Sequence, residues 1–322
     1  MTCTPRTACP GGSPGATFPL IDLRDVHLRA RGAFLGLATG DALGASVEFL
    51  TAAEVRAKHG VHRDLVGGGW LRLRPGGITD DTEMSLCVGR ALVATGQFSR
   101  QAIADRFAAW LKGGPTDVGN ACRRGIRSYI VDGTLEVPPA AWNAGNGAAM
   151  RMLPVALFTL GDDALLRRCA LEQARLTHHH PLSDAACILV GRLVQAACLG
   201  RPLAHLRAQV DEFVAEYPTF RFEPYRGLAT GYVVDTLQTV FHHLFSTSTL
   251  EEALVATVNQ GGDADTTGAI VGMIAGALYG PAAFPRRWVR RMDGRLLAEL
   301  ATLAERLVEL SPLALNRPAL SP

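Results

Sequence analysis

The sequence lacks the marks of a secreted, disulfide-bonded or membrane-spanning protein. Its 7 cysteines are scattered without a C-x-x-C pair, so neither a disulfide framework nor a structural zinc site is indicated. The first twenty residues contain several prolines and glycines but no apolar core of a secretory signal. The most apolar stretch, residues 268–279, is much shorter than the roughly 20 residues of a membrane-spanning helix. We therefore expect a cytoplasmic protein with residues 1–25 as a flexible tail.

A charge excess of either sign is also absent, because 32 lysines and arginines nearly balance 30 aspartates and glutamates. No overall field therefore attracts nucleic acid or an anionic membrane. We expect no nucleic-acid partner, a monomer, and recognition of any partner through local contacts.

Alternating β patterns are scarce and no repeat of fixed period appears, which argues against a solenoid. Apolar residues instead return at intervals of three and four, with glycine or proline at most breaks, as is typical of helices. The sequence predicts an all-α fold in a single compact multi-helix domain over residues 26–322. Glycines inside several helices, among them Gly36, Gly40, Gly272 and Gly276, predict close helix contacts, because each otherwise costs about 1 kcal/mol against alanine. The predicted helices are 26–43, 82–95, 100–111, 148–160, 182–199, 227–245, 250–258, 266–279 and 294–310.

Two acidic turns carry the strongest chemical signal. Each follows a pair of glycines and precedes an apolar helix. Helix capping explains one carboxylate in each turn, but not two carboxylates with threonine hydroxyls beside them. If the turns converge, the repelling carboxylates need cations, and their hard oxygen ligands favour Mg²⁺ or Mn²⁺ over zinc. The pattern therefore favours a two-metal hydrolase site over capping alone. The turns are Thr79-Asp80-Asp81-Thr82-Glu83 and Asp263-Ala264-Asp265-Thr266-Thr267.

Other segments are ambiguous when each is taken alone. The glycine-rich loop at 143–151 offers free amides for a phosphate, or is an ordinary turn that caps a helix. Asp117 is either a helix N-cap or a carboxylate for a cationic substrate group. Three consecutive histidines, 178–180, cannot all face one ion, and Pro181 predicts a turn that opens the next helix. Tyr232 could stack on a base if it faces the site.

The motifs together resemble the ADP-ribosylglycohydrolase family. The resemblance rests on GLATGDALG at 36–44, TDDTE at 79–83, NAGNGAAM at 143–150 and NQGGDADTTG at 259–268. Within the family, the chain is most similar to the branch that acts on dinitrogenase reductase, the iron protein of nitrogenase. The segments that carry this second similarity are 110–112, 117–120, 177–181 and 220–226. The similarity extends from about Val26 to the C-terminal helices.

This resemblance implies a set of site residues. It implies two metal ions, manganese in this branch with magnesium as the alternative, held by residues matching Thr79, Asp80, Asp81, Asp263, Asp265 and Thr266. Catalysis would involve Asp80, Asp263 and Asp117, of which Asp117 meets the guanidinium of the substrate arginine. Nucleotide contacts would come from Asn120, Asn146, Gly147, His178 and Tyr232, with Glu48 as a mobile acidic residue at the cleft mouth. One departure is His179, where we expect asparagine.

The implied activity is hydrolysis of ADP-ribose from an arginine of dinitrogenase reductase, which reactivates that protein. The resemblance also implies regulation by a PII signalling protein with an ammonium transporter, and reversible peripheral membrane association. Alternatives are activity on ADP-ribosylserine or poly(ADP-ribose), and a non-catalytic ADP-ribose-binding relative. A terpenoid synthase, a further all-α alternative, would require a third aspartate where this chain has Met84.

Overall fold

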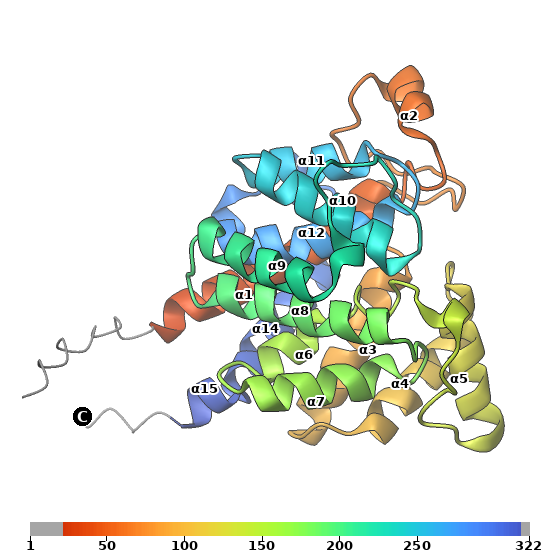
Figure 1. Ribbon diagram of the computed structural model, residues 1–322, viewed down its shortest axis with the longest axis vertical. Helices are drawn as coiled ribbons and strands as arrows, with labels where there is room; N and C mark the ends of the chain where they lie inside the picture. The colour runs from red at the N-terminus through yellow and green to blue at the C-terminus, as the bar shows by residue number, and fades with distance from the viewer. Residues whose placement is uncertain (1–21, 317–322) are drawn as a thin grey trace, which may run out of the picture.

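Helices form from the alanine- and leucine-rich segments of the chain. The computed structural model describes residues 22–316, and within this part the backbone forms helices joined by turns, with no strand (Figure 1). The predicted all-α fold is confirmed. The α-helices are α1 (Leu23–Gly44), α2 (Ala52–His59), α3 (Asp80–Thr95), α4 (Arg100–Lys112), α5 (Asn120–Asp132), α6 (Leu153–Phe158), α7 (Asp163–Ala174), α8 (Pro181–Cys198), α9 (Leu203–Glu216), α10 (Val233–Ser246), α11 (Leu250–Val258), α12 (Ala264–Tyr279), α13 (Arg286–Val289), α14 (Gly294–Glu309) and α15 (Pro312–Leu315).

The first helix begins earlier than predicted. Asp22 accepts a hydrogen bond from the Arg24 amide and so caps α1, which starts at Leu23 rather than Val26. The helical domain therefore includes residues 23–25, which the sequence assigned to the tail. The rest of the predicted tail, residues 1–21, lies outside the described residues, as do residues 317–322.

Two predicted helices begin later than expected. The segment predicted as 148–160 becomes helical only at Leu153, and the segment predicted as 227–245 only at Val233. The backbone before each start is bonded to distant segments: the Ala148 carbonyl accepts from the Gln173 side-chain amide, and the Ala229 carbonyl accepts from the Asp263 amide. These bonds use groups that an α-helix would need for its own ladder.

The centre of the fold is the antiparallel pair α1 and α12, which lie side by side in Figure 1. Glycines spaced by four face each other along the contact. A Cβ at Gly36 would lie 1.9 Å from the Gly272 carbonyl oxygen, and one at Gly40 would lie 1.9 Å from that of Gly268. The predicted close helix contact is confirmed at these positions, and it brings the end of α1 against the start of α12.

Helix α8 is buried beside this pair. It is the one helix of residues 22–316 whose length and apolarity alone would suffice to cross a membrane, yet 72% of it is buried inside the fold. Buried apolar residues of α1, α3, α6, α8, α10, α12 and α14 belong to one continuous core. This core supports the helix ends that carry the acidic turns.

Candidate functional site

Asp41 joins the end of α1 to the first acidic turn. Its carboxylate accepts hydrogen bonds from the Thr79 amide at 3.0 Å and hydroxyl at 2.9 Å, and from the Thr82 amide at 3.1 Å and hydroxyl. The start of α3 is therefore capped from another helix rather than by its own N-cap residue, Thr79, whose side chain makes no capping bond. Asp41 was not predicted as a site residue, although an aspartate inside an apolar helix was a signal for it.

The two acidic turns meet at Asp81. Its Oδ2 accepts hydrogen bonds from the Thr79 hydroxyl and from the Thr266 hydroxyl, each at 3.2 Å. In the second turn the N-cap residue of α12, Asp263, makes no capping bond, and Asp265 accepts only from the amide of the next residue, Thr266, at 2.9 Å. Capping alone therefore does not explain either turn.

Burial makes the charged forms of these carboxylates unfavourable. Desolvation, with repulsion from neighbouring carboxylates, raises the pKa of Asp80 to about 7 and raises those of Asp81 and Asp265 well above the usual range. Burial likewise raises the pKa of Asp41 to about 6. Within residues 22–316 no group hydrogen-bonds the buried Oδ1 of Asp81. This oxygen-rich set, with one acceptor unsatisfied, fits a divalent cation.

A cleft of about 920 Å³ opens above the turns. Carboxylate oxygens of Glu48, Asp117 and Asp265 lie within 4.8 Å of one another on its wall. The N-cap of α5 is Gly119, so the capping interpretation of Asp117 is wrong. The Gly119 amide instead donates to Asp80 Oδ2 at 2.9 Å. The segment at the start of α5 thus orients Asp80 by a hydrogen bond and carries Asp117 on the cleft wall.

Glu48 is turned inward and held by a rim residue. The Trp70 indole N–H donates to its Oε2 at 2.5 Å, and burial raises the pKa of Glu48 to about 8. The next residue, Phe49, has a left-handed φ of 62° and packs on the Trp70 ring at 5.5 Å between centroids. Such strain at a non-glycine residue is typical of functional segments. No sequence signal indicated Trp70.

The glycine-rich loop also lines the cleft. The Asn146 side-chain amide donates to Asp263 Oδ2 at 2.6 Å and to the Thr236 hydroxyl at 2.9 Å. Gly145 and Gly147 cover the ring of His178, because a Cβ at either would lie about 3 Å from ring atoms. Burial, with the positive charge of Arg151, lowers the pKa of His178 to about 3, so the ring is neutral.

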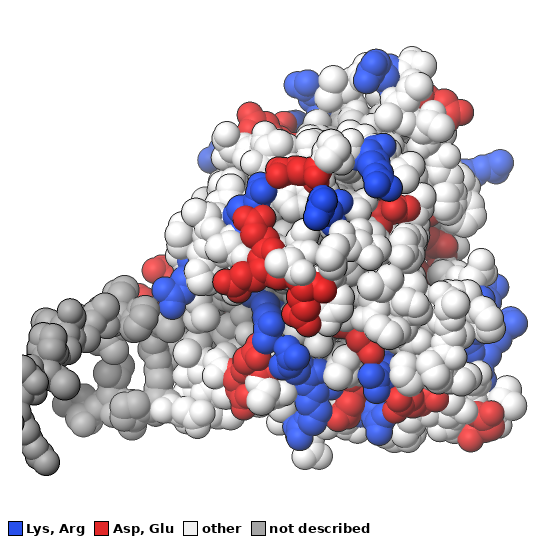
Figure 2. Space-filling view, viewed as in Figure 1, with Lys and Arg blue, Asp and Glu red and all other residues white. Residues whose placement is uncertain are grey.

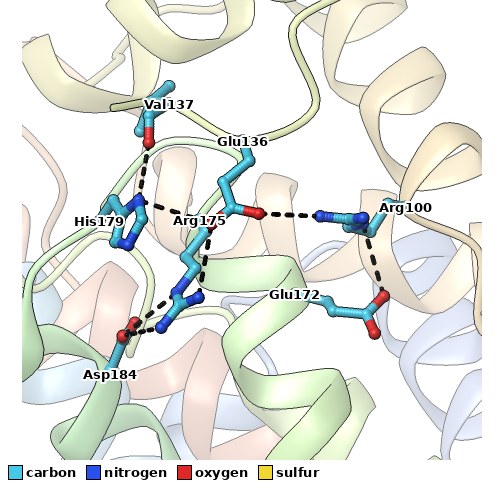
Figure 3. A network of polar contacts seen from close by, with 7 residues as sticks. All are labelled: Arg100, Glu136, Val137, Glu172, Arg175, His179 and Asp184. Carbon is cyan, nitrogen blue, oxygen red and sulfur yellow. Dashed lines mark hydrogen bonds and ion pairs between the residues drawn. The ribbon is translucent and has the colours of Figure 1, made fainter. Parts of the chain in front are cut away.

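The three histidines have separate surroundings. His178 lines the cleft. The ring of His180 accepts from the Leu182 amide and caps α8, so the helix predicted after Pro181 is confirmed and includes that proline. Figure 3 shows His179 in a polar network, where its Nδ1 lies 2.8 Å from the Val137 carbonyl and 3.6 Å from a Glu136 oxygen. Only one of the three histidines therefore faces the cleft.

The same network fastens the segment before the glycine-rich loop. Glu136 pairs with Arg100 of α4 and Arg175 after α7, and Arg175 pairs with Asp184 of α8 at 2.9 Å (Figure 3). Half-buried pairs of this kind stabilise modestly. Their effect here is to fix where the chain enters the cleft wall.

Most of the predicted site residues line the cleft. Those that do are Glu48, Asp80, Asp117, Asn120, Asn146, Gly147, His178, Asp263, Asp265 and Thr266. Thr79 and Asp81 are buried behind the wall. Tyr232 is 40% exposed and is not a lining residue, although the preceding Gly231 is. The structure thus brings together segments far apart in the sequence, with Tyr232 at the margin.

Comparison with known proteins agrees with this arrangement. The ADP-ribosylglycohydrolase family model matches residues 22–315. The chain is 53% identical to the ADP-ribosyl-[dinitrogen reductase] glycohydrolase of Rhodospirillum rubrum, over 89% of this chain and 98% of that protein. It is 29% identical to the ADP-ribosylarginine hydrolase Tri1 of Serratia proteamaculans, over 88% and 80%. A solved ADP-ribosylglycohydrolase-related protein complex superposes with a TM-score of 0.79 at 34% identity, over 89% and 99%. The chain belongs to the ADP-ribosylglycohydrolase family.

Proposed function

We propose that the protein hydrolyses the bond between ADP-ribose and a modified arginine of dinitrogenase reductase, and so reactivates the nitrogenase iron protein. The observation that carries the proposal is the 53% identity to a Rhodospirillum rubrum glycohydrolase named for that substrate. The acidic cleft supports it, since about 920 Å³ is within the range of small-molecule sites. Family membership makes the terpenoid synthase alternative wrong.

The family is metal-dependent, and the cleft wall is an acidic candidate metal site. We propose two Mn²⁺ ions, with Mg²⁺ as the alternative, since carboxylate and hydroxyl oxygens are hard ligands. The unsatisfied Asp81 oxygen and the raised carboxyl pKa values support this. When bound, the ions would supply Lewis acidity that polarises water and orients ribose hydroxyls. The proposed ligands are Thr79, Asp80, Asp81, Asp263, Asp265 and Thr266.

Asp117 is the proposed partner of the arginine guanidinium. Burial raises its pKa, and a cation beside it would offset the cost of its charge. Such a pair would fix the leaving group relative to the anomeric carbon. Asp80 and Asp263 would act on the ribose side, where bonds from the Gly119 amide and the Asn146 side chain hold their orientation.

The remaining predicted residues are proposed to hold the nucleotide. Asn120 offers its side-chain amide, and Asn146, whose N–H groups bond Thr236 and Asp263, offers its carbonyl oxygen. Gly147 lines the cleft, and its missing Cβ makes room for the His178 ring behind it. Neutral His178 supports that loop from beneath. Tyr232, at the margin, would contact only the outer part of the nucleotide.

The test is to incubate ADP-ribosylated dinitrogenase reductase with the protein and follow release of ADP-ribose. We expect release with Mn²⁺, none with chelator, and at least about a hundredfold loss for Asp117→Ala. ADP-ribosylserine peptides and poly(ADP-ribose) serve as comparison substrates. Faster release of ADP-ribose from one of these than from dinitrogenase reductase would assign the linkage of that substrate instead of arginine. Binding of ADP-ribose without any release would assign the non-catalytic alternative.

The proposal includes a cytoplasmic monomer that associates reversibly with the membrane through a PII signalling protein and an ammonium transporter. Its support is the similarity of the motifs to the branch acting on dinitrogenase reductase. Co-purification of the PII protein with this chain, lost on removal of the transporter from the membrane fraction, is the expected result. Absence of both proteins from a native pull-down would contradict this part.

A further inference from the structure

Arginines gather on the surface beside the cleft. We call this set the arginine surface: Arg63, Arg72, Arg74, Arg286, Arg287, Arg290, Arg291 and Arg295, all exposed. Contacts join its two parts, residues 63–74 and residues 286–295. Arg287 pairs with Asp64 at 2.6 Å, the Trp288 indole donates to the Arg63 carbonyl at 2.8 Å, and a Cβ at Gly76 would lie 2.2 Å from the Arg291 carbonyl oxygen.

Most of this positive charge is not neutralised within the molecule. Arg287 pairs with Asp64 and Glu251, and Arg74 pairs with Asp293 at 3.3 Å. The other six members have no ion pair in the part of the chain that the structure describes. The chain as a whole carries only two more basic than acidic residues. The arginine surface therefore carries a local excess of positive charge on a nearly neutral protein, and this excess favours an anionic partner.

The arginine surface is continuous with the cleft. Gly68 and Leu73 exchange two backbone hydrogen bonds, at 2.7 and 2.9 Å, and the turn between them carries both Trp70 and Arg72. Trp70 lines the cleft and is 52% exposed. On the other side, Gly76, which touches Arg291, is four residues from Asp80, at most about 14 Å of extended chain. A molecule larger than the cleft would therefore meet the arginine surface.

The composition of the rim favours a protein partner. Phe49 and Trp70 expose aromatic area at the cleft edge, next to the arginines. Aromatic residues and arginine are enriched where proteins bind proteins. Arg72 also holds a left-handed φ of 54°, which glycine would adopt at lower cost. A non-glycine residue held in such a strained turn is typical of a functional position.

We propose that the arginine surface binds an acidic face of the ADP-ribosylated protein substrate while the modified side chain occupies the cleft. This inference rests on the proposed function. It assigns recognition of the protein to residues 63–74 and 286–295, and recognition of the modification to the acidic cleft. Small ADP-ribosylated arginine compounds would then be hydrolysed without using the arginine surface.

The experiment compares kcat/KM for ADP-ribosylated dinitrogenase reductase and for free ADP-ribosylarginine. Arg290→Glu with Arg291→Glu should lower the first value about tenfold or more, mainly through KM, and leave the second within about twofold. The matched control is Arg167→Glu with Arg168→Glu, which makes the same charge change at another adjacent exposed pair. This pair lies on α7, and Figure 2 shows charges of both signs intermixed on the side of the molecule where α7 lies. The control should change neither value.

A second variant separates charge from folding. Arg72→Gly removes one positive charge and relieves the left-handed backbone, so its Tm should equal or exceed that of the wild type. Its kcat/KM for the protein substrate should nevertheless fall, while that for ADP-ribosylarginine stays the same.

The outcomes distinguish the two claims. If the wild type hydrolyses neither substrate, the proposed function is wrong and this inference fails with it. If it hydrolyses both and the Arg290/Arg291 variant acts like the wild type, only the inference is overturned. Loss of binding to phosphatidylserine vesicles, with unchanged kinetics on the protein, would instead make the arginine surface a membrane site.

Discussion

The carboxylate of Asp41, in α1, caps the start of α3, which the N-cap residue Thr79 does not do. It accepts from both the amides and the hydroxyls of Thr79 and Thr82, and so orients Thr79 towards Asp81. The types of the candidate ligands could be predicted from sequence, because paired aspartates in apolar surroundings need a counterion. The sequence marked Asp41 only as an aspartate inside an apolar helix and did not mark Trp70, and the roles of both could not be predicted, because they depend on contacts made 38 and 22 residues away.

Asp41→Ala should therefore affect both stability and metal binding. We expect a loss of about 3 kcal/mol in the free energy of unfolding, because buried donors lose their acceptor, and at least tenfold weaker Mn²⁺ binding. Urea denaturation and metal titration measure the two effects. Asp162→Ala is the control, since Asp162 caps α7 far from the turns. It should cost about 1 kcal/mol and leave Mn²⁺ affinity unchanged. Wild-type Mn²⁺ affinity in Asp41→Ala would contradict the role.

Trp70→Phe tests how Glu48 is held. The change keeps the aromatic rim but removes the indole donor, so the buried Glu48 carboxyl loses its hydrogen bond. We expect kcat/KM to fall about tenfold with ADP-ribosylarginine, equivalent to about 1.4 kcal/mol. Trp142→Phe, at an exposed tryptophan outside the cleft lining, should leave activity unchanged. Equal activity of the two variants would show that the bond to Glu48 does not matter.

At the scale of helices, a long apolar pattern was sufficient to predict where a helix lies. It did not predict a helix start that depends on contacts with distant segments. The apolar helix predicted at 266–279 differs from α12 only at its start, because Asp263 is the N-cap and the helix begins two residues earlier, at Ala264. The late start of α10 could not be predicted, since Ala229 and Gly231 bond to segments distant in sequence. The glycines of α1 and α12 predicted close packing, but their pairing partners appear only in the fold.

Gly36→Ala tests the contact between α1 and α12. Its Cβ would lie 1.9 Å from the Gly272 carbonyl oxygen, which the backbone can relieve only by separating the helices. We expect a loss of about 3 kcal/mol in stability, with weaker Mn²⁺ binding because the ends of both helices carry the site. Gly294→Ala meets no atom within 4 Å and should stay within about 1 kcal/mol of the wild type. Equal stability of the two variants would refute the close contact.

At the scale of the whole molecule, the candidate site exists only when the chain is folded. Its carboxylates come from α1 and the segment that follows it, the start of α3, the segment before α5 and the start of α12. The composition predicted a protein without a strong overall field, and the resemblance of the motifs gave the family. Neither could predict how closely the carboxylates approach, because that distance is set by the packing of α1 on α12. This convergence has a cost that depends on pH.

Ionisation of the buried carboxyls in the metal-free protein sets that cost. Burial raises the pKa of Asp80 to about 7 and that of Asp41 to about 6, with Asp81 and Asp265 also raised. In the folded metal-free protein these carboxyls bind more protons than in the unfolded chain above about pH 4, so their contribution to stability falls as pH rises. Buried histidines with lowered pKa values, His178 and His243 among them, have the opposite effect below about pH 6.5. In chelator, we therefore expect Tm to fall by roughly 5 °C or more between pH 7 and 8.

Divalent cations should reverse this trend, because they bind the ionised carboxylates and compete with protons. The increase in Tm on adding Mn²⁺ should therefore grow from pH 5.5 to pH 8. Asp81→Asn replaces one buried charge with a neutral group of similar shape, so in chelator at pH 8 it should be more stable than the wild type, yet gain little from Mn²⁺. A metal-free wild type whose Tm rises between pH 7 and 8 would contradict the assignment of these buried carboxylates as a cation site.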